Sequence, residues 1–191
     1  HGELLLDGAL HPHQAHAEIQ DTAGTTDGAN LAFTVDVTRP TLEIQRPQAG
    51  YLTETTVPVG LAYADNLGLD LKTLVVSVDG QDRTADFQKT ATAASASLTL
   101  APGGHTILAS IRDLAGNASL PASREFTIDV AAPSLGFVKP DGARCIASQS
   151  VEAVLEYSDD QALDLASLSV TLDGQPLAMT EIGTARATAV A

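Results

Sequence analysis

The stretch YADNLGLDLKTLVVSVDGQ (residues 63–81) recurs as YSDDQALDLASLSVTLDGQ (residues 157–175). The matched residues all keep one offset, 157 − 63 = 94, and a match of this kind is not explained by chance. The matched pairs are Tyr63/Tyr157, Asp65/Asp159, Asp70/Asp164, Leu71/Leu165, Leu74/Leu168, Val76/Val170, Asp79/Asp173, Gly80/Gly174 and Gln81/Gln175. Self-similarity at a fixed period predicts repeated structural units rather than one irregular domain.

A second pair of stretches extends the repeat toward both ends. HAEIQDTAGTTDGANLAFTVDVTRP (16–40) aligns with LASIRDLAGNASLPASREFTIDVAAP (108–133) at offsets of 92 to 93. The matched pairs here are Asp21/Asp113, Gly24/Gly116, Phe33/Phe126, Asp36/Asp129 and Pro40/Pro133. One period therefore covers about 93 residues, and the 191 residues of the chain hold about two periods.

Within a period the apolar residues alternate, and turn residues interrupt them every eight to twelve positions, which predicts an all-β fold built as a sandwich. About seven strands are predicted between residues 41 and 130, at 41–45, 56–64, 73–78, a short piece near 83–87, 95–100, 105–111 and 124–130. Asp79-Gly80 and Asp173-Gly174 separate strand-like runs and predict tight hairpins, since both residue types tolerate positive φ. DLKTL and DLASL predict one helical turn each, with Asp70 or Asp164 as its N-cap.

Two short proline-containing segments predict the domain boundaries. DVTRP (36–40) and DVAAP (129–133) fall between the last strand of one unit and the first strand of the next. Proline fixes φ and lacks a backbone donor, so these segments are expected to be stiff linkers. The predicted division is residues 1–38 as the C-terminal half of one unit, 39–131 as a complete unit and 132–191 as the N-terminal half of another.

Several motifs together resemble those of a known group of domains. They are Gly104-His105-Thr106, Asp113 to Asn117, Phe126-Thr127-Ile128-Asp129 and Pro133. The pattern resembles bacterial immunoglobulin-like tandem repeats of secreted and cell-surface proteins, a group that shades into cadherin-like and fibronectin type III-like modules. The resemblance covers nearly the whole chain and implies tandem immunoglobulin-like β-sandwiches of about seven strands each. The N-terminal copy departs from it, with Thr25 in place of Asn117 and Pro12 in place of Gly104.

Composition excludes some partners. The chain has 10 Lys and Arg against 24 Asp and Glu, a formal net charge of −14 that repels nucleic-acid phosphates and anionic membranes. No apolar run is long enough to span a membrane, so neither nucleic-acid binding nor membrane insertion is expected. The single cysteine, Cys145, cannot form an intrachain disulfide. It is interpreted as a buried strand residue, with a reactive thiol or an interchain link as the alternative.

No catalytic motif is present in the sequence. G-x-S-x-G, H-E-x-x-H, the phosphate-binding G-x-x-x-x-G-K and paired cysteines are all missing, and no enzymatic activity is predicted. His11, His13 and His16 could on paper ligate a metal. On a strand, however, His11 and His13 share a face that His16 does not, and His13 aligns with His105, so a structural role is expected.

The carboxylates are the stronger candidates for chemistry. In the immunoglobulin-like sandwich that the resemblance implies, the loop after the second strand meets the loop between the last two strands near the incoming linker. The candidate calcium ligands that this end gathers are Asp65, Asn66, Asp70, Asp113 and Asn117. Calcium takes several such oxygen ligands, and cadherin-like modules stiffen their joints in this way. The alternative is that Asp113 and Asn117 shape a turn around Gly116, Asp70 caps a turn and Asp65 is solvated.

The resulting functional hypothesis is a non-catalytic structural or spacer module of a secreted or surface-anchored bacterial repeat protein: a stalk, a fibre or an adhesin rod. Its partners would be neighbouring immunoglobulin-like domains of the same or identical chains. The chain starts and stops at nearly equivalent points of the repeat. It is therefore either a window on a longer array, or a unit whose residues 132–191 are completed by residues 1–38 of another chain, giving a head-to-tail filament.

The alternative hypothesis is an accessory module of a secreted enzyme or toxin that recognises a protein or glycan ligand. Aromatic residues make up only 4% of the chain and Trp is absent, which disfavours stacking on a sugar. Of Tyr51, Tyr63 and Tyr157, the last two occupy equivalent strand positions and are expected to lie in the core.

Overall fold

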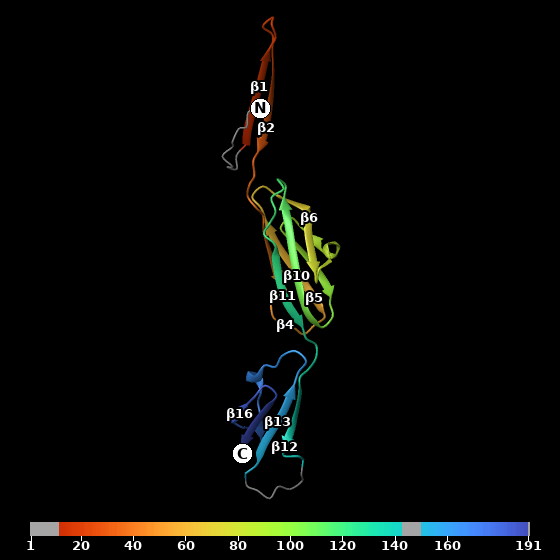
Figure 1. The fold of residues 1–191 in the computed structure, drawn as a ribbon, viewed down its shortest axis with the longest axis vertical. Helices are drawn as coiled ribbons and strands as arrows, with labels where there is room; N and C mark the ends of the chain where they lie inside the picture. The colour runs from red at the N-terminus through yellow and green to blue at the C-terminus, as the bar shows by residue number, and fades with distance from the viewer. Residues whose placement is uncertain (1–11, 143–149, 191) are drawn as a thin grey trace. The chain divides into compact units, whose positions relative to one another are not determined.

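The computed structural model describes residues 12–142 and 150–190, which form β-strands joined by turns and short 3-10 helices (Figure 1). The chain divides into two compact units, residues 1–128 and 129–191. The candidate metal ligand His11 and the single cysteine, Cys145, lie outside the described residues. The predicted all-β sandwich class is confirmed.

The first unit begins with a hairpin of β1 (Pro12–Gln20) and β2 (Thr26–Thr34), which pair in antiparallel fashion. Asp21 closes the turn between them, because its Oδ1 accepts hydrogen bonds of 2.8 Å from the backbone N–H groups of Ala23 and Thr25. Gly24 takes a φ of +89°, which a residue with a Cβ rarely adopts. The matched turn at Asp113 has the same backbone bonds: its N–H donates to Asn117 O, and Gly116 N–H donates to Asp113 O.

Residues 41–128 form a sandwich of two sheets. The first sheet has the order β3-β5-β9-β8, with bounds Thr41–Arg46, Thr56–Ala64, Ala93–Thr99 and Gln88–Lys89. The second has the order β4-β11-β10-β6-β7, with bounds Tyr51–Leu52, Ala122–Ile128, Gly103–Asp113, Leu69–Val78 and Gln81–Asp82. The first segment of the sandwich thus contributes one strand to each sheet. β3 pairs antiparallel with β5, whereas β4 pairs parallel with β11 in the opposite sheet.

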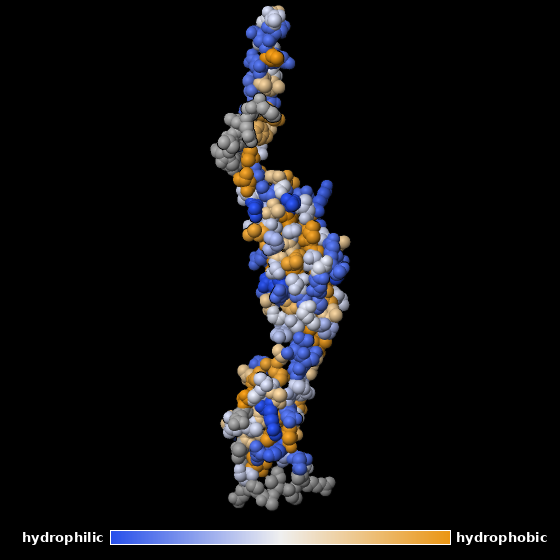
Figure 2. All heavy atoms as spheres, viewed as in Figure 1, coloured by the Kyte–Doolittle hydropathy of each residue, from blue (hydrophilic) through white to orange (hydrophobic). Residues whose placement is uncertain are grey.

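The core lies between these two sheets because side chains alternate along each strand. On β5, Val57, Val59, Leu61 and Tyr63 are all 3% exposed or less, while the residues between them face outward or are half-buried. The second sheet contributes Leu74, Val76, Val78, Ile107, Ala109, Ile111, Phe126 and Ile128 to the same cluster. Most of the polar residues face solvent, and they colour much of the surface blue in Figure 2.

The structure corrects two local predictions. The piece near residues 83–87 is not a strand but a 3-10 turn, η1 (Thr84–Asp86), in which Asp82 Oδ1 accepts from Thr84 N–H at 2.9 Å. The segment DLKTL is not a helical turn, because it lies within β6 and both of its flanks pair with β10. It forms an irregularity there, since Ser110 pairs with Val75 and Arg112 with Asp70.

The two predicted Asp-Gly hairpins are confirmed. Asp79 and Gly80 have φ of +53° and +77°, and Asp173 and Gly174 have φ of +51° and +81°. Each pair joins strands through two residues, since Val78 pairs with Gln81 and Leu172 pairs with Gln175. Positive φ at both turn positions matches the right-handed twist of the flanking strands.

The second unit contains a sheet of order β12-β13-β17-β16, with bounds Ser134–Lys139, Glu152–Ser158, Arg186–Val190 and Glu181–Ile182. A separate pair consists of β14 (Thr171–Leu172) and β15 (Gln175–Pro176). DLASL contains the predicted helical turn, η2 (Leu165–Ser167), and Asp164 is its N-cap, accepting from Ala166 N–H at 3.0 Å. The buried residues of this unit include Val154, Leu155, Tyr157, Ala187 and Ala189.

Tyr63 is a core residue, as its position in the repeat predicts, and the structure also gives its hydroxyl group two acceptors. Its side chain donates to the carbonyl oxygens of Thr90 (2.9 Å) and Ala93 (2.6 Å), and burial raises the pKa of its phenol. Tyr157 is buried in the second unit and donates in the same way to Gly183 O. In each unit the hydroxyl ties the central strand to a loop of its own unit.

Replacing Tyr63 by Phe is expected to lower the free energy of unfolding by about 1 kcal/mol, because the carbonyl oxygens of Thr90 and Ala93 lose the hydroxyl that donates to them while the ring stays in place. Urea unfolding monitored by circular dichroism measures the change. Tyr51→Phe is the matched control, since Tyr51 is 60% exposed. Equal stability of the two variants would show that the Tyr63 hydroxyl does not stabilise the sandwich.

Candidate metal centre

Three carboxylates from separate segments meet at one end of the sandwich. Asp36 lies in the linker after β2, Asp65 in the loop after β5, and Asp113 at the end of β10. One oxygen from each lies within 4.8 Å of the others. The segments come together because the β5–β6 loop and the β10–β11 turn lie at the end of the sandwich that the linker approaches.

Local hydrogen bonds fix two of these side chains. Asp65 Oδ2 accepts from the backbone N–H groups of Leu67 and Gly68, each at 3.0 Å, which folds the loop around the carboxylate. Asp36 Oδ1 accepts from Thr38 N–H at 3.0 Å. In both residues one carboxylate oxygen is held by the backbone, which leaves the second oxygen for the cluster.

Asp113 is the most buried of the three, with 2% of its surface exposed. Burial by itself raises the pKa of its carboxyl group, but hydrogen bonds from Asn117 and from the backbone of Gly116 and Ala115 outweigh this, so the pKa is lowered. Two of these bonds come from Asn117, whose N–H and Nδ2 each lie 2.7 Å from an oxygen of Asp113. Asp113 is therefore held as a buried anion.

Two asparagines connect the cluster. Asn117 Nδ2 donates to the carbonyl oxygen of Asp36 at 3.0 Å as well as to Asp113, so it joins the linker to the β10–β11 turn. One terminal atom of the Asn66 amide lies 3.2 Å and 3.3 Å from the two oxygens of Asp65. The amide nitrogen in that position donates to both carboxylate oxygens, so Asn66 holds the Asp65 side chain in place.

Four of the five residues predicted from the sequence lie at this end, and the fifth does not belong to the cluster. Asp70 Oδ1 accepts from Lys72 N–H at 3.1 Å, and its carbonyl oxygen accepts from Thr73 Oγ1 at 2.7 Å. It shapes the irregularity in β6. Asp36 was not predicted as a ligand, although its repeat match with Asp129 already placed an aspartate in each linker.

The second unit has a cluster at matching positions. Asp129, Asp159 and Asp160 each place one oxygen within 4.8 Å of the others. Asp129 and Asp159 match Asp36 and Asp65, and Asp160 stands where Asn66 stands. The local bonds match too: Asp159 Oδ2 accepts from Gln161 and Ala162 N–H, and Asp129 Oδ1 accepts from Ala131 N–H.

The three described histidines, His13, His16 and His105, contact residues on neighbouring strands and form no common site. His13 pairs across the hairpin with Phe33, with ring centroids 5.4 Å apart, and His105 pairs with Phe126 in the same register at 5.5 Å. His16 Nδ1 lies 2.8 Å from Asn30 Oδ1. Within β1, His13 and His16 are three residues apart and so lie on opposite faces, as the sequence predicts.

His105 also forms an ion pair with the Asp79 turn. Its Nδ1 lies 2.7 Å from Asp79 Oδ2, and its Nε2 lies 2.8 Å from Ala101 O. Burial lowers the pKa of His105, but the bonds to Asp79 and Ala101 and the charge of Asp79 outweigh it, so the pKa is raised. Burial likewise raises the pKa of Asp79, but the bonds from His105 and Thr106 and the charge of His105 lower it overall.

Among residues 12–142 and 150–190, no helix has the length and apolar character needed to cross a bilayer.

No protein-family model and no curated protein matches the chain. Among solved structures, it is similar to an endo-β-1,4-mannanase from Thermotoga petrophila (14% identity, 50% of this chain and 21% of that one, TM-score 0.41). It is also similar to the CbhA fibronectin(III)-like modules of Clostridium thermocellum (16% identity, 65% and 66% covered, TM-score 0.40). A third match is CopC from Methylosinus trichosporium OB3b (14% identity, 45% and 88% covered, TM-score 0.36).

The chain thus spans 21% of the length of the mannanase structure and 66% of that of the CbhA modules. The fold class follows from the strand order and the buried faces.

The stabilising effect of the Asp79–His105 pair is expected to depend on pH. The folded pKa of His105 lies above its ordinary 6.5, so its contribution is complete below pH 6.5 and is lost as pH rises through the folded value. The folded pKa of Asp79 lies below its ordinary 3.8, so its contribution is complete above pH 3.8 and is lost as pH falls through the folded value. The pair therefore stabilises most between these two limits.

Asp79→Asn keeps a residue that tolerates the positive φ but removes the charge beside His105. Melting temperatures at about pH 5.5 and pH 8 are expected to differ less for this variant than for the unmodified chain. Asp173→Asn, at the equivalent turn, is the matched control and should leave the difference unchanged. An unaltered pH dependence in Asp79→Asn would exclude the pair as its source.

Proposed function

We propose that the chain is a non-catalytic structural segment of a secreted or surface-anchored repeat protein, in which immunoglobulin-like sandwiches act as load-bearing spacers. The observation that carries this proposal is the pairing of the first and last strands of the sandwich 41–128. Thr127 and Ile128 at the end of β11 pair with Tyr51 and Leu52 of β4, in parallel. Thr127 N–H also donates to Gly50 O at 2.9 Å.

This pairing resists tension applied through the ends of the domain. Parallel strands begin at the same end of the sheet, so a pull on the linker before β3 and a pull on the segment after β11 act in opposite directions along the two strands. The hydrogen bonds between β4 and β11 are then loaded together, in shear, rather than one after another. A spacer between an anchor and a distal domain experiences force along this line.

The accessory-module alternative has less support. Glycan recognition commonly uses exposed aromatic faces, and Tyr63 and Tyr157 are only 3% and 6% exposed. Tyr51, the remaining tyrosine, is 60% exposed but belongs to β4, the short strand that pairs with β11. The three tyrosines thus belong to the core or to a paired strand.

The spacer role predicts a direction-dependent mechanical strength. The test uses a Cys145→Ala background with cysteines introduced for attachment. Single-molecule pulling between Thr38→Cys and Val130→Cys loads β4 and β11 in shear. Leu120 lies before β11, at the same end of the sandwich as Thr38. Pulling between Thr38→Cys and Leu120→Cys therefore loads the sandwich across its strands rather than along them. The unfolding force is expected to be several-fold higher in the first geometry, and equal forces would contradict a load-bearing role.

The proposed role includes joining to neighbouring units of the same or identical chains, because each flanking piece exposes residues that the complete sandwich buries. Ile19 of β1 is 74% exposed, whereas the equivalent Ile111 of β10 is 1% exposed. Phe137 of β12 is 62% exposed, whereas the equivalent Ile44 of β3 is 2% exposed. Apolar residues, orange in Figure 2, accordingly reach the surface of both pieces.

The two pieces are complementary in strand content. In the sandwich, the β10–β11 hairpin lies next to β6 and faces the sheet that contains β3 and β5. The hairpin β1–β2 matches β10–β11 in sequence and in the His–Phe register. The described part of residues 129–191 has the equivalents of β3, β5, β9 and β8 but not of β10 and β11. Supplying that hairpin would complete the sandwich.

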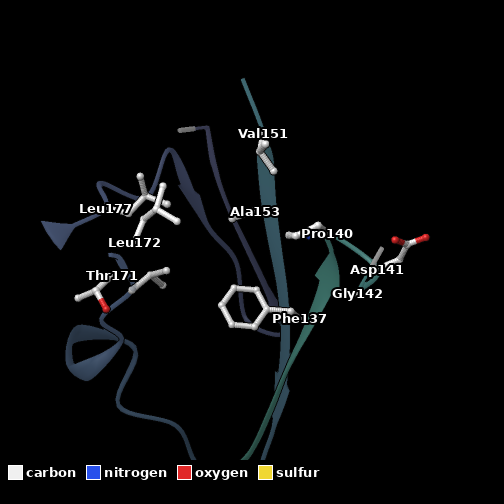
Figure 3. Close-up of a pocket in the computed structure, with 10 residues that line it drawn as sticks. Phe137, Pro140, Asp141, Gly142, Val151, Ala153, Thr171, Leu172 and Leu177 are labelled. Atoms are coloured by element: carbon white, nitrogen blue, oxygen red, sulfur yellow. The ribbon is translucent and has the colours of Figure 1, made fainter. Parts of the chain in front are cut away.

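The second unit has an open cavity over which we propose that the added hairpin lies. It has a volume of about 790 Å³ and is lined by Phe137, Val151, Ala153, Val170, Leu172 and Leu177, among others. Figure 3 shows Phe137 projecting from its strand toward the segment that carries Thr171 and Leu172. Leu172 is 52% exposed here, whereas the equivalent Val78 of the complete sandwich is 3% exposed. Burying each such side chain stabilises by about 1.5–3 kcal/mol.

Joining through this face is heterologous, so copies of the chain are expected to form open head-to-tail oligomers whose mass rises with concentration. Sedimentation velocity over a hundredfold concentration range measures this. Ile19→Asp should leave the chain monomeric, whereas Val75→Asp, at a 51% exposed position of β6, should not affect assembly. A chain that stays monomeric throughout would exclude strand complementation. The spacer role does not require assembly and is tested separately by the pulling experiment.

A further inference from the structure

We propose that each of the two carboxylate clusters, Asp36/Asp65/Asp113 and Asp129/Asp159/Asp160, binds one calcium ion that ties a linker to the sandwich following it. The first cluster differs from the ligand set that the sequence predicts, because Asp36 of the linker belongs to it and Asp70 does not. This proposal does not depend on the spacer role or on assembly of copies.

The first observation behind it is an unsatisfied oxygen in each cluster. Oδ2 of Asp36 is buried and has no hydrogen-bond partner, and Oδ1 of Asp159 is buried and has none either. A buried carboxylate oxygen without a partner costs free energy, and native structures rarely leave one in that state. In each cluster the unpartnered oxygen belongs to one of the three carboxylates that converge.

Charge balance points the same way. In the part of the chain that the structure describes, no Lys, Arg or His forms an ion pair with Asp36, Asp65 or Asp113. Asp113 is nonetheless buried, and both of its carboxylate oxygens accept hydrogen bonds from Asn117. Carboxylates this close repel one another unless a proton or a cation lies between them. A divalent cation neutralises the cluster and also supplies the missing partner of Asp36 Oδ2.

The available ligand atoms suit calcium better than other ions. The first cluster offers carboxylate oxygens of Asp36, Asp65 and Asp113. Oxygen-only donors on loops accommodate the six to eight flexible ligands of calcium, with water completing the shell, whereas magnesium demands strict octahedral geometry. The absence of His and Cys among these residues disfavours zinc.

The recurrence of the cluster is the second, independent observation. The two clusters lie in different units, and each contains a linker aspartate capped by the N–H two residues later and a loop aspartate whose Oδ2 closes its own turn. In both, one of these two aspartates keeps the unpartnered buried oxygen. A turn-forming role accounts for the capped oxygens but not for the unpartnered ones, which are the atoms that a cation would contact.

Isothermal titration calorimetry of the calcium-free 191-residue chain with CaCl₂ tests the proposal, together with melting curves in calcium, magnesium and chelator. Two calcium ions per chain are expected, with a melting temperature that rises in calcium, returns in chelator and rises less in magnesium. Asp36→Asn keeps the oxygen that caps Thr38 but loses the charge, and it should weaken one site about tenfold or more. Asp129→Asn should do the same to the other site.

Asp70→Asn is the matched control, because Asp70 lies at the start of β6, next to the loop that carries Asp65 but outside the cluster. This variant should bind calcium normally. Circular dichroism verifies that each variant remains folded, so that loss of binding is not confused with loss of structure. No heat of binding and no calcium-dependent shift in melting would overturn the proposal. Equal weakening by Asp70→Asn and Asp36→Asn would also overturn it, because the site would then not be the one described.

Discussion

The inner faces of two sheets must cover one another, and the rest of this structure depends on that requirement. In residues 41–128 it is met, since strands of both sheets bury an unbroken cluster from Ile44 to Ile128. Outside that range the same residue types stand at the same strand positions but remain exposed, as Ile19 and Phe137 show. The alternating pattern fixes which side chains face inward, but whether they are buried depends on the presence of the opposing sheet.

The second constraint acts where the chain enters each sandwich. The linker aspartates Asp36 and Asp129 meet the loop aspartates Asp65 and Asp159, and in the first unit Asn117 joins Asp36 to the β10–β11 turn. These contacts explain why three features occur together in one period. They are the linker segments DVTRP and DVAAP, the acidic loops after β5 and β13, and the D-x-A-G-N turn. Proline stiffens the linker, and in the first unit the hydrogen bond from Asn117 to Asp36 attaches it to the sandwich that follows.

The sequence predicts the fold better than it predicts the site. Alternation and Asp-Gly turns place β3, β5, β9, β10 and β11 to within a few residues, because these signals are local. DLKTL and DLASL match in sequence yet differ in structure, because DLKTL has β10 to pair with and DLASL does not. The role of Asp36 depends on where a linker meets two distant loops, and Asp70 has the right residue type in the wrong position. Neither follows from spacing along the chain.

Hydrogen exchange followed by mass spectrometry at low protein concentration tests the central claim most directly. This claim is that residues 41–128 form a complete sandwich, whereas the flanking strands, among the residues that the structure describes, lack a full opposing sheet. Strands β5, β6 and β10 are expected to exchange only through global unfolding. The hairpin β1–β2 should exchange orders of magnitude faster, although its sequence matches β10–β11. Equal protection of the two hairpins in the monomer would contradict the account, because β1–β2 would then have a covering sheet of its own.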